Sequence, residues 1–192
     1  MGTLVRLSAA ALASLVMAAA PTQAVGPSQK DVSADPKALA IHLASEAAGS
    51  PAILEAVKEQ NVRTLNQLLP EIRQAELAWR TTKGVDAKMR ALMESPCAGA
   101  LRALQGRSTR IADVTLLDTR GVVVCMTSRA AHFHWGEQPE FSHAFNGSLG
   151  GVFVGKPVFD EAAGDYVVPV SVPVVAGRQA IGVISLRVLA AQ

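Results

Sequence analysis

The feature that most constrains the fold of this chain is a change in hydrophobic periodicity near residue 110. Before that point apolar residues recur every three or four positions, and after it they alternate with polar or turn residues. A period of 3.6 indicates helices, whereas a period of 2 indicates strands with one buried face. Five strands are expected, at 114–117, 122–126, 152–159, 166–174 and 180–188.

The fourth expected strand, 166–174, carries valines on one face and both Pro169 and Pro173 on the other. Proline lacks the N–H that a central strand donates to its neighbour. This strand is therefore expected at a sheet edge or with a bulge.

The segment 35–107 contains repeated helix start and stop signals. Asp-Pro or Ser-Pro pairs begin at Asp35, Ser50 and Ser95, and Asp86 can cap a further helix. Glycines then follow the apolar stripes at the expected helix ends. We expect an α+β fold in which this helical segment packs on a five-stranded antiparallel sheet formed by 108–192.

The first 24 residues have the pattern of a secretory signal peptide. Arg6 precedes an uncharged apolar run over 7–20, and small residues at Thr22 and Ala24 suit cleavage after Ala24. The run is shorter than the roughly twenty residues that span a bilayer, although an uncleaved anchor is the alternative. We therefore expect a periplasmic protein with a mobile leader at 25–34 and no membrane insertion after cleavage.

Charge and motif content exclude several functions. The 18 basic residues, of which only Arg6 lies in the signal segment, nearly balance 16 acidic ones and form no cluster. Binding to nucleic acid or to an anionic membrane is therefore not expected. Nucleophile-elbow, zinc-protease and phosphate-loop motifs are absent from the sequence, so we expect no enzyme and no cofactor.

Cys97 and Cys125 are the only cysteines. Export would place them in an oxidising environment, where a nearby pair forms a disulfide. The apolar surroundings of Cys125 fit a buried free thiol equally well. Both states remain open from the sequence.

The connection 127–151 between the second and third expected strands is unusually long for a compact domain, which is typical of functional loops. The chain is only 4% aromatic, and at least half of its rings lie in or near this loop. His132 and His134 are two residues apart, so both can face one side of an extended segment. With Glu137 or His143 they could bind zinc or copper, or they could contact an organic ligand or bond locally.

The sequence resembles the extracytoplasmic PAS-like sensor domains called Cache or PDC domains, and more narrowly the small stand-alone single-Cache proteins of proteobacterial periplasms. The resemblance is carried by 75–80 ending in Trp79-Arg80, by Val114 to Gly121, by His134-Trp135-Gly136-Glu137, by Phe159-Asp160-Glu161 and by the two last strands. Where the family loop usually runs aspartate, tyrosine, tryptophan, glutamine, glycine and aspartate, this chain has His132 to Glu137.

The resemblance implies a small organic anion, amine or amino acid held between the sheet and the long loop. The expected ligand-binding residues are Arg80, His132, Phe133, His134, Trp135, Phe159 and Tyr166. Asp160 and Glu161 fall in an expected turn, where acidic residues are usually solvated.

The sequence thus predicts an exported single-Cache module that binds a small ligand and acts with a membrane-bound receptor or another signalling protein of the envelope. The alternative is a periplasmic transition-metal-binding protein that uses His132, His134 and Glu137 or His143. A third possibility is a structural interaction module in which Trp135 and its neighbours fill the pocket.

Overall fold

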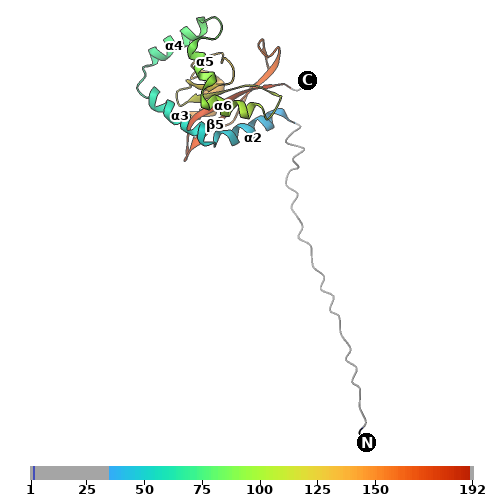
Figure 1. Ribbon diagram of the computed structural model, residues 1–192. Coiled ribbons are helices and arrows are strands. Elements are labelled where there is room, and N and C mark those ends of the chain that lie inside the picture. Colours follow the sequence, from blue (N-terminus) through green and yellow to red (C-terminus); the bar gives the residue numbers. More distant parts are fainter. Residues whose placement is uncertain (1, 3–34, 191–192) are drawn as a thin grey trace.

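The computed structural model describes Gly2 and residues 35–190 (Figure 1). The expected signal peptide and leader therefore lie outside the described residues, Gly2 apart. None of the helices in the described part is both long and apolar enough to cross a membrane.

The helical segment is confirmed, and four of its five helices begin directly after an expected capping residue, whereas the third follows Leu68, whose side chain makes no capping hydrogen bond. The helices are α2 (Pro36–Ala48), α3 (Pro51–Thr64), α4 (Leu69–Thr81), α5 (Ala87–Glu94) and α6 (Pro96–Gln105). The side chains of Asp35, Ser50, Asp86 and Ser95 each accept a hydrogen bond from a backbone N–H in the first turn. These caps satisfy donors that a helix start leaves unpaired.

The α+β fold with an antiparallel sheet is confirmed, with six strands instead of five. They are β1 (Ile111–Asp118), β2 (Val123–Met126), β3 (Phe153–Val154), β4 (Val158–Asp160), β5 (Asp165–Ala176) and β6 (Gln179–Leu189). The order is β2-β1-β6-β5-β3, and β4 also pairs with β5. Between β2 and β3 the chain forms α7 (Pro139–Phe145) and the short helix η1 (Asn146–Ser148).

Two expectations about strands need correction. The strand expected at 152–159 is broken into β3 and β4, and β5 is not at an edge because β6 pairs with one side of it and β3 and β4 with the other. The break between β3 and β4 explains how β5 tolerates its two prolines. Pro169 lies opposite the break, where its carbonyl accepts from the Gly155 N–H (2.8 Å). Pro173 lies beyond the end of β3, so no N–H is needed there. The expected bulge is present, between Val174 and Val175.

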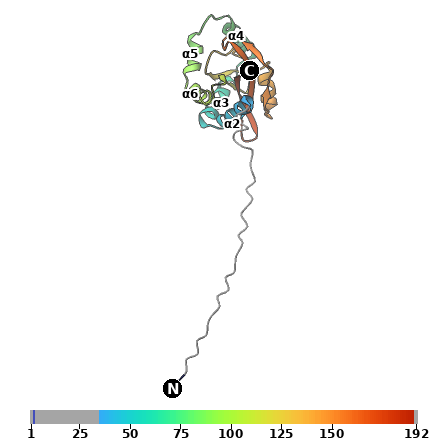
Figure 2. The same cartoon turned by 90° about the vertical axis from the view of Figure 1, so that its right-hand side faces the viewer.

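The two faces of the sheet differ in chemistry. On one face, alternate residues of β1, β5 and β6 form an apolar core with α2, α3 and α6. The other face is covered by α7 and the loop that precedes it, and its apolar cluster includes Trp79, Met126 and Phe133. In Figure 2, α6 and the orange α7 segment lie on opposite sides of the sheet.

Cys97 and Cys125 form a disulfide, which settles the alternative that the sequence left open. It joins the first turn of α6 to β2, and the two Cα atoms lie 6.0 Å apart. The bond thereby fixes the helical layer to an outer strand of the sheet.

Asp118 ends β1 and is fully buried. Its carboxylate accepts from the N–H groups of Arg120 (2.8 Å) and Val122 (2.9 Å) in the β1–β2 turn, and from the Thr64 hydroxyl (2.8 Å) of α3. Burial raises the pKa of Asp118 above its usual 3.8, although these hydrogen bonds act in the opposite direction. Asp118 therefore both shapes the turn, as the sequence indicates, and anchors α3 to it.

Replacing both cysteines by alanine should lower the free energy of unfolding by about 3–4 kcal/mol, because the cross-link restricts the unfolded chain. The closed loop spans 28 residues. Urea titration of the oxidised protein and of the double variant measures the difference. Wild-type protein in a reducing agent is the control and should match the variant, and equal urea midpoints for all three samples would contradict the expectation.

Asp118→Ala should lower the free energy of unfolding at pH 7 by about 2–4 kcal/mol, since it leaves buried N–H groups without an acceptor. Asp118→Asn, which keeps an acceptor oxygen, should cost less.

The folded state binds a proton at Asp118 more tightly than the unfolded state, because burial raises its pKa. Wild-type stability relative to Asp118→Asn should therefore rise as the pH falls through the folded pKa towards 3.8, and stay constant below it. Denaturant titrations between pH 7 and 3.5 test this, and a pH-independent difference would contradict it.

Candidate functional site

The face of the sheet below the long loop carries a row of buried polar side chains. Asp113 and Thr115 of β1, Ser171 of β5, and Ser185 of β6 are all buried on this face. The strand register places Thr115 and Ser171 on either side of Ser185, and the Ser171 hydroxyl donates to that of Ser185 (3.0 Å). These four residues are not among the predicted site residues, although polar side chains at alternate positions of apolar strands are the signal that marks them.

Arg187 of β6 lies on the same face and forms ion pairs with Asp113 of β1 and Asp160 of β4. Its guanidinium therefore links three strands. The side chains of Arg187 and Asp160 are only 28% and 15% exposed. The expectation that Asp160 is solvated is wrong, because its side chain is mostly buried at the end of β4 and is paired with the partly buried Arg187.

Residues 131–136, called the roof below, cross over this polar face from the outer edge of β2. The Trp135 N–H donates to the Gly121 carbonyl (2.7 Å), and the Val123 N–H donates to the Phe133 carbonyl (3.0 Å). Gly121 has a φ of 76°, and a Cβ there would lie 2.6 Å from the Gly136 nitrogen. Only glycine therefore allows the β1–β2 turn and the roof to approach so closely.

A cavity of about 190 Å³ lies between the roof and the sheet, and we call it the loop pocket. Its lining comes from the roof, from the start of α7 and from β4, β5 and β6: Ala131, His132, Trp135, Gln138, Glu140, Val158, Asp160, Val167, Pro169, Ser185 and Arg187. A smaller hollow of about 40 Å³ shares the roof and Arg187 and reaches Asp113 and Thr115. Apolar walls with a few converging polar groups are typical of small-ligand sites.

Glu140, in the first turn of α7, contributes an unusual group to the loop pocket. Its Oε2 atom is buried, and no described residue donates a hydrogen bond to it. A buried carboxylate oxygen without a donor is costly and needs an explanation. No local pattern in the sequence marks this residue, because an acidic residue in the first turn of a helix is common.

Of the residues predicted to bind a ligand, His132 and Trp135 line the loop pocket. Phe133 is buried on the other side of the roof, where its ring lies 5.5 Å from that of Trp79. His134 lies beside β2, with Nε2 3.0 Å from the Arg120 carbonyl oxygen. Adjacent residues of the roof therefore point in different directions, and only His132 and Trp135 of these four reach the loop pocket.

The structure does not place Arg80, Phe159 and Tyr166 in the lining of the loop pocket. Arg80 is exposed near the end of α4. Phe159 and Tyr166 are 59% and 55% exposed and pack edge to face, with ring centres 5.6 Å apart. Strand alternation explains this position. Val158, Asp160 and Val167 line the pocket, and Phe159 and Tyr166, which are their neighbours along β4 and β5, face the opposite side of the sheet.

The four residues of the metal alternative each have a different partner. His132 Nδ1 lies 2.9 Å from a Glu76 oxygen, and His134 Nε2 contacts the Arg120 carbonyl. His143 Nδ1 lies 3.0 Å from the Pro139 carbonyl, and Glu137 forms an ion pair with Arg73. Within residues 35–190, no three His, Cys, Asp or Glu side chains are grouped so that they could hold a metal ion. The geometry therefore gives the metal alternative no support.

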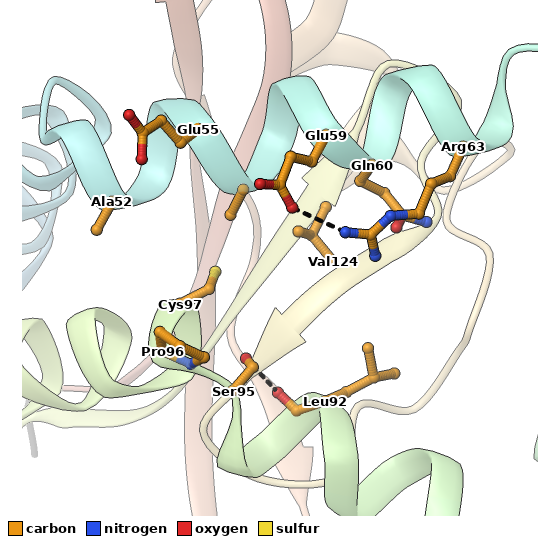
Figure 3. A pocket seen from close by; sticks show the side chains of 11 residues that line it. Ala52, Glu55, Glu59, Gln60, Arg63, Leu92, Ser95, Pro96, Cys97 and Val124 are labelled. Carbon is orange, nitrogen blue, oxygen red and sulfur yellow. Dashed lines mark hydrogen bonds and ion pairs between the residues drawn. The ribbon is translucent and has the colours of Figure 1, made fainter.

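A groove of about 370 Å³, separate from the loop pocket, runs between α3 and the α5–α6 junction. Figure 3 shows Glu55, Glu59 and Arg63 along α3, with Ser95 to Cys97 across from them and Val124 between. Glu59 pairs with Arg63 (2.8 Å), and both side chains are about two-thirds exposed. The Ser95 hydroxyl bonds the Leu92 carbonyl (3.3 Å). Because these polar groups are paired or solvated, this groove has less to offer a ligand than the loop pocket.

No protein-family model and no curated protein matches this chain. Among solved structures it is similar to the sensor domain of the histidine kinase DctB from V. cholerae, with 16% identity, 71% of this chain and 53% of that chain covered, and a TM-score of 0.39. The sensory domain of the Campylobacter jejuni chemoreceptor Tlp3 with isoleucine bound has 14% identity, 86% and 64% coverage and a TM-score of 0.39.

A third similar structure is the ligand-binding domain of the Pseudomonas aeruginosa amino acid chemoreceptor PctC in complex with GABA, with 15% identity, 81% and 62% coverage and a TM-score of 0.37. The chain spans between half and two thirds of the length of these solved structures. All three of these structures are sensor, sensory or ligand-binding domains.

Proposed function

We propose that this chain is a binding module for a small organic ligand that carries an ammonium group, and that the loop pocket holds this ligand. The observation that carries the proposal is Glu140, a residue of the pocket lining whose Oε2 atom is buried and has no donor among the described residues. A ligand N⁺–H would supply the missing hydrogen bond and balance the charge.

The charge distribution around the pocket supports a cationic ligand. Three carboxylates lie around the loop pocket and the smaller hollow beside it, those of Asp113, Glu140 and Asp160. One guanidinium, that of Arg187, lies among them. His132 is already paired with Glu76, outside the lining. The excess of negative charge in a partly buried site favours a positive ligand group.

Size and shape restrict the rest of the ligand. About 190 Å³ is below the roughly 300–1,000 Å³ of pockets for drug-sized ligands, so the ligand has few heavy atoms. Val158, Val167, Pro169 and the Trp135 ring offer apolar surface for a short aliphatic stem. A small alkylamine, free or as part of an amino acid, fits these walls.

The proposed module works in the cell envelope and acts through a partner, a membrane-bound receptor or another signalling protein. Support for export comes from the signal-peptide pattern of 1–24. We assign it binding instead of catalysis, because Arg187, Asp113 and Asp160 form fixed ion pairs and are not arranged as a nucleophile with its base.

n-Butylamine should bind the wild-type protein, whereas butan-1-ol and butyrate, which have the same carbon chain, should not. Glu140→Gln should weaken n-butylamine binding about 10- to 100-fold, because it removes a charge-assisted hydrogen bond. Isothermal titration calorimetry measures both effects, and 2-aminobutyrate tests whether a carboxylate is accepted beside the ammonium group.

The matched control is Glu161→Gln, which removes an exposed carboxylate that does not line the pocket. Its affinity for n-butylamine should equal that of the wild type. Equal binding of the amine and the alcohol, or an equal loss in both variants, would rule out the proposed site.

In a Gram-negative host the mature protein should begin at Val25, because the small residues Thr22 and Ala24 suit signal-peptidase cleavage. Intact-mass measurement of the protein from the periplasmic fraction gives the cleavage position. Full-length protein that stays with the membrane fraction would instead indicate an uncleaved anchor.

A further inference from the structure

Helix α4 is attached to the domain differently from its neighbours. Helices α2, α3, α5, α6 and α7 have their main contacts with strands of the sheet. Helix α4 adds Ile72 and Trp79 to the apolar cluster that includes Met126 and Phe133, and its polar contacts run largely to residues 129–137. The Trp79 indole N–H donates to the Ala130 carbonyl (2.9 Å). The Arg129 guanidinium donates to the carbonyls of Trp79, Thr82 and Gly84 at the end of α4, where the helix dipole favours a cation.

The central contact is made by Glu76 of α4. Its carboxylate lies 2.9 Å from His132 Nδ1 and accepts from the backbone N–H groups of Phe133 (2.6 Å) and His134 (3.0 Å). The Glu76 side chain is only 18% exposed. Hydrogen bonds to a charged acceptor are stronger than neutral ones, particularly away from water.

Glu76 does not line the loop pocket, but the residues that it binds form the pocket roof. His132 lines the pocket, and its carbonyl accepts from the Trp135 indole N–H (2.9 Å). The His132 and Trp135 rings also pack edge to face, 5.5 Å apart. Both pocket-lining rings are therefore connected to α4 through this one carboxylate.

The β1–β2 turn holds the roof from its other side. The Trp135 N–H bonds Gly121, and the Val123 N–H bonds Phe133. Without Glu76 the turn would still hold the end of the roof at Trp135, but the N–H groups of Phe133 and His134 would lose their acceptor. The part of the roof that carries His132 would then lose its bonds to Glu76, while the Trp79–Ala130 and Val123–Phe133 bonds on either side of it would remain.

We propose that Glu76 is a positioning residue of the loop pocket, which ties the roof to α4 and makes the position of that helix part of the binding equilibrium. The consequence for ligand affinity rests on the proposed function, whereas the attachment of the roof does not. Ligand entry and exit would then displace α4 together with the roof, and the rest of the helical layer would stay on the sheet.

The attachment is tested in the ligand-free protein by amide hydrogen exchange followed by NMR. In Glu76→Ala the exchange rates of the Phe133 and His134 amides should rise about tenfold or more, because both donors lose a charged acceptor. Glu76→Gln keeps an acceptor oxygen at the same reach and should retain most of the protection. Glu137→Gln, which breaks the exposed Arg73–Glu137 pair between the same two segments, is the control and should leave both rates unchanged.

Unchanged rates at Phe133 and His134 in Glu76→Ala, or an equal rise in the β5 and β6 amides, would overturn the proposal. If Glu76→Ala does not fold, Glu76→Asp replaces it. The shorter side chain keeps the charge but cannot reach both N–H groups from the same position, so it should show the same selective rise. Unchanged rates in Glu76→Asp would overturn the proposal as well.

The effect on the pocket is measured with n-butylamine as the probe. Glu76→Ala should weaken binding about tenfold and Glu76→Gln by less than about threefold, although neither removes a lining residue. Glu140→Gln should weaken binding without changing the exchange of the roof amides. Failure of wild-type protein to bind the amine would thus count against the proposed function alone, whereas full affinity in Glu76→Ala would overturn the role of Glu76.

Discussion

The rest of the structure depends on the position of the partly buried Arg187 side chain between two carboxylates on one face of the sheet. A guanidinium removed from water needs partners close by, and Asp113 and Asp160 supply them from β1 and β4. The two ion pairs join β6 to β1 and β4, and they lie on the face that also carries the row of buried polar side chains, whereas the other face packs on helices. A roof over the polar face then encloses a cavity with charged groups at its floor.

The helices could be predicted from the sequence because their limits depend on local chemistry. Asp35, Ser50, Asp86 and Ser95 bond to N–H groups two or three residues away, so the signal lies within one turn of chain. The break between β3 and β4 could not be read in this way. It depends on where Pro169 falls in the register of β5, which only the pairing of distant segments determines.

The candidate site shows the same division. The length of the 127–151 connection and its share of the few aromatic residues predict a functional loop, and His132 and Trp135 of this loop line the pocket. Asp160 and Arg187 belong together only because β4, β5 and β6 lie side by side, a relation that spacing along the chain does not reveal. The scarcity of aromatic residues and the family resemblance predict that Phe159 contacts the ligand, yet strand alternation turns its side chain to the opposite face.

The roof also closes the outer edge of the sheet at β2. The Val122–His134 bridge and the bond from the Val123 N–H to the Phe133 carbonyl occupy backbone groups that an edge strand otherwise presents to other molecules. The opposite edge is formed by β3 and β4, which are too short to serve as a long template. A roof that opened fully would therefore expose β2 to pairing with strands of other chains, so protection from aggregation limits how far the site can open.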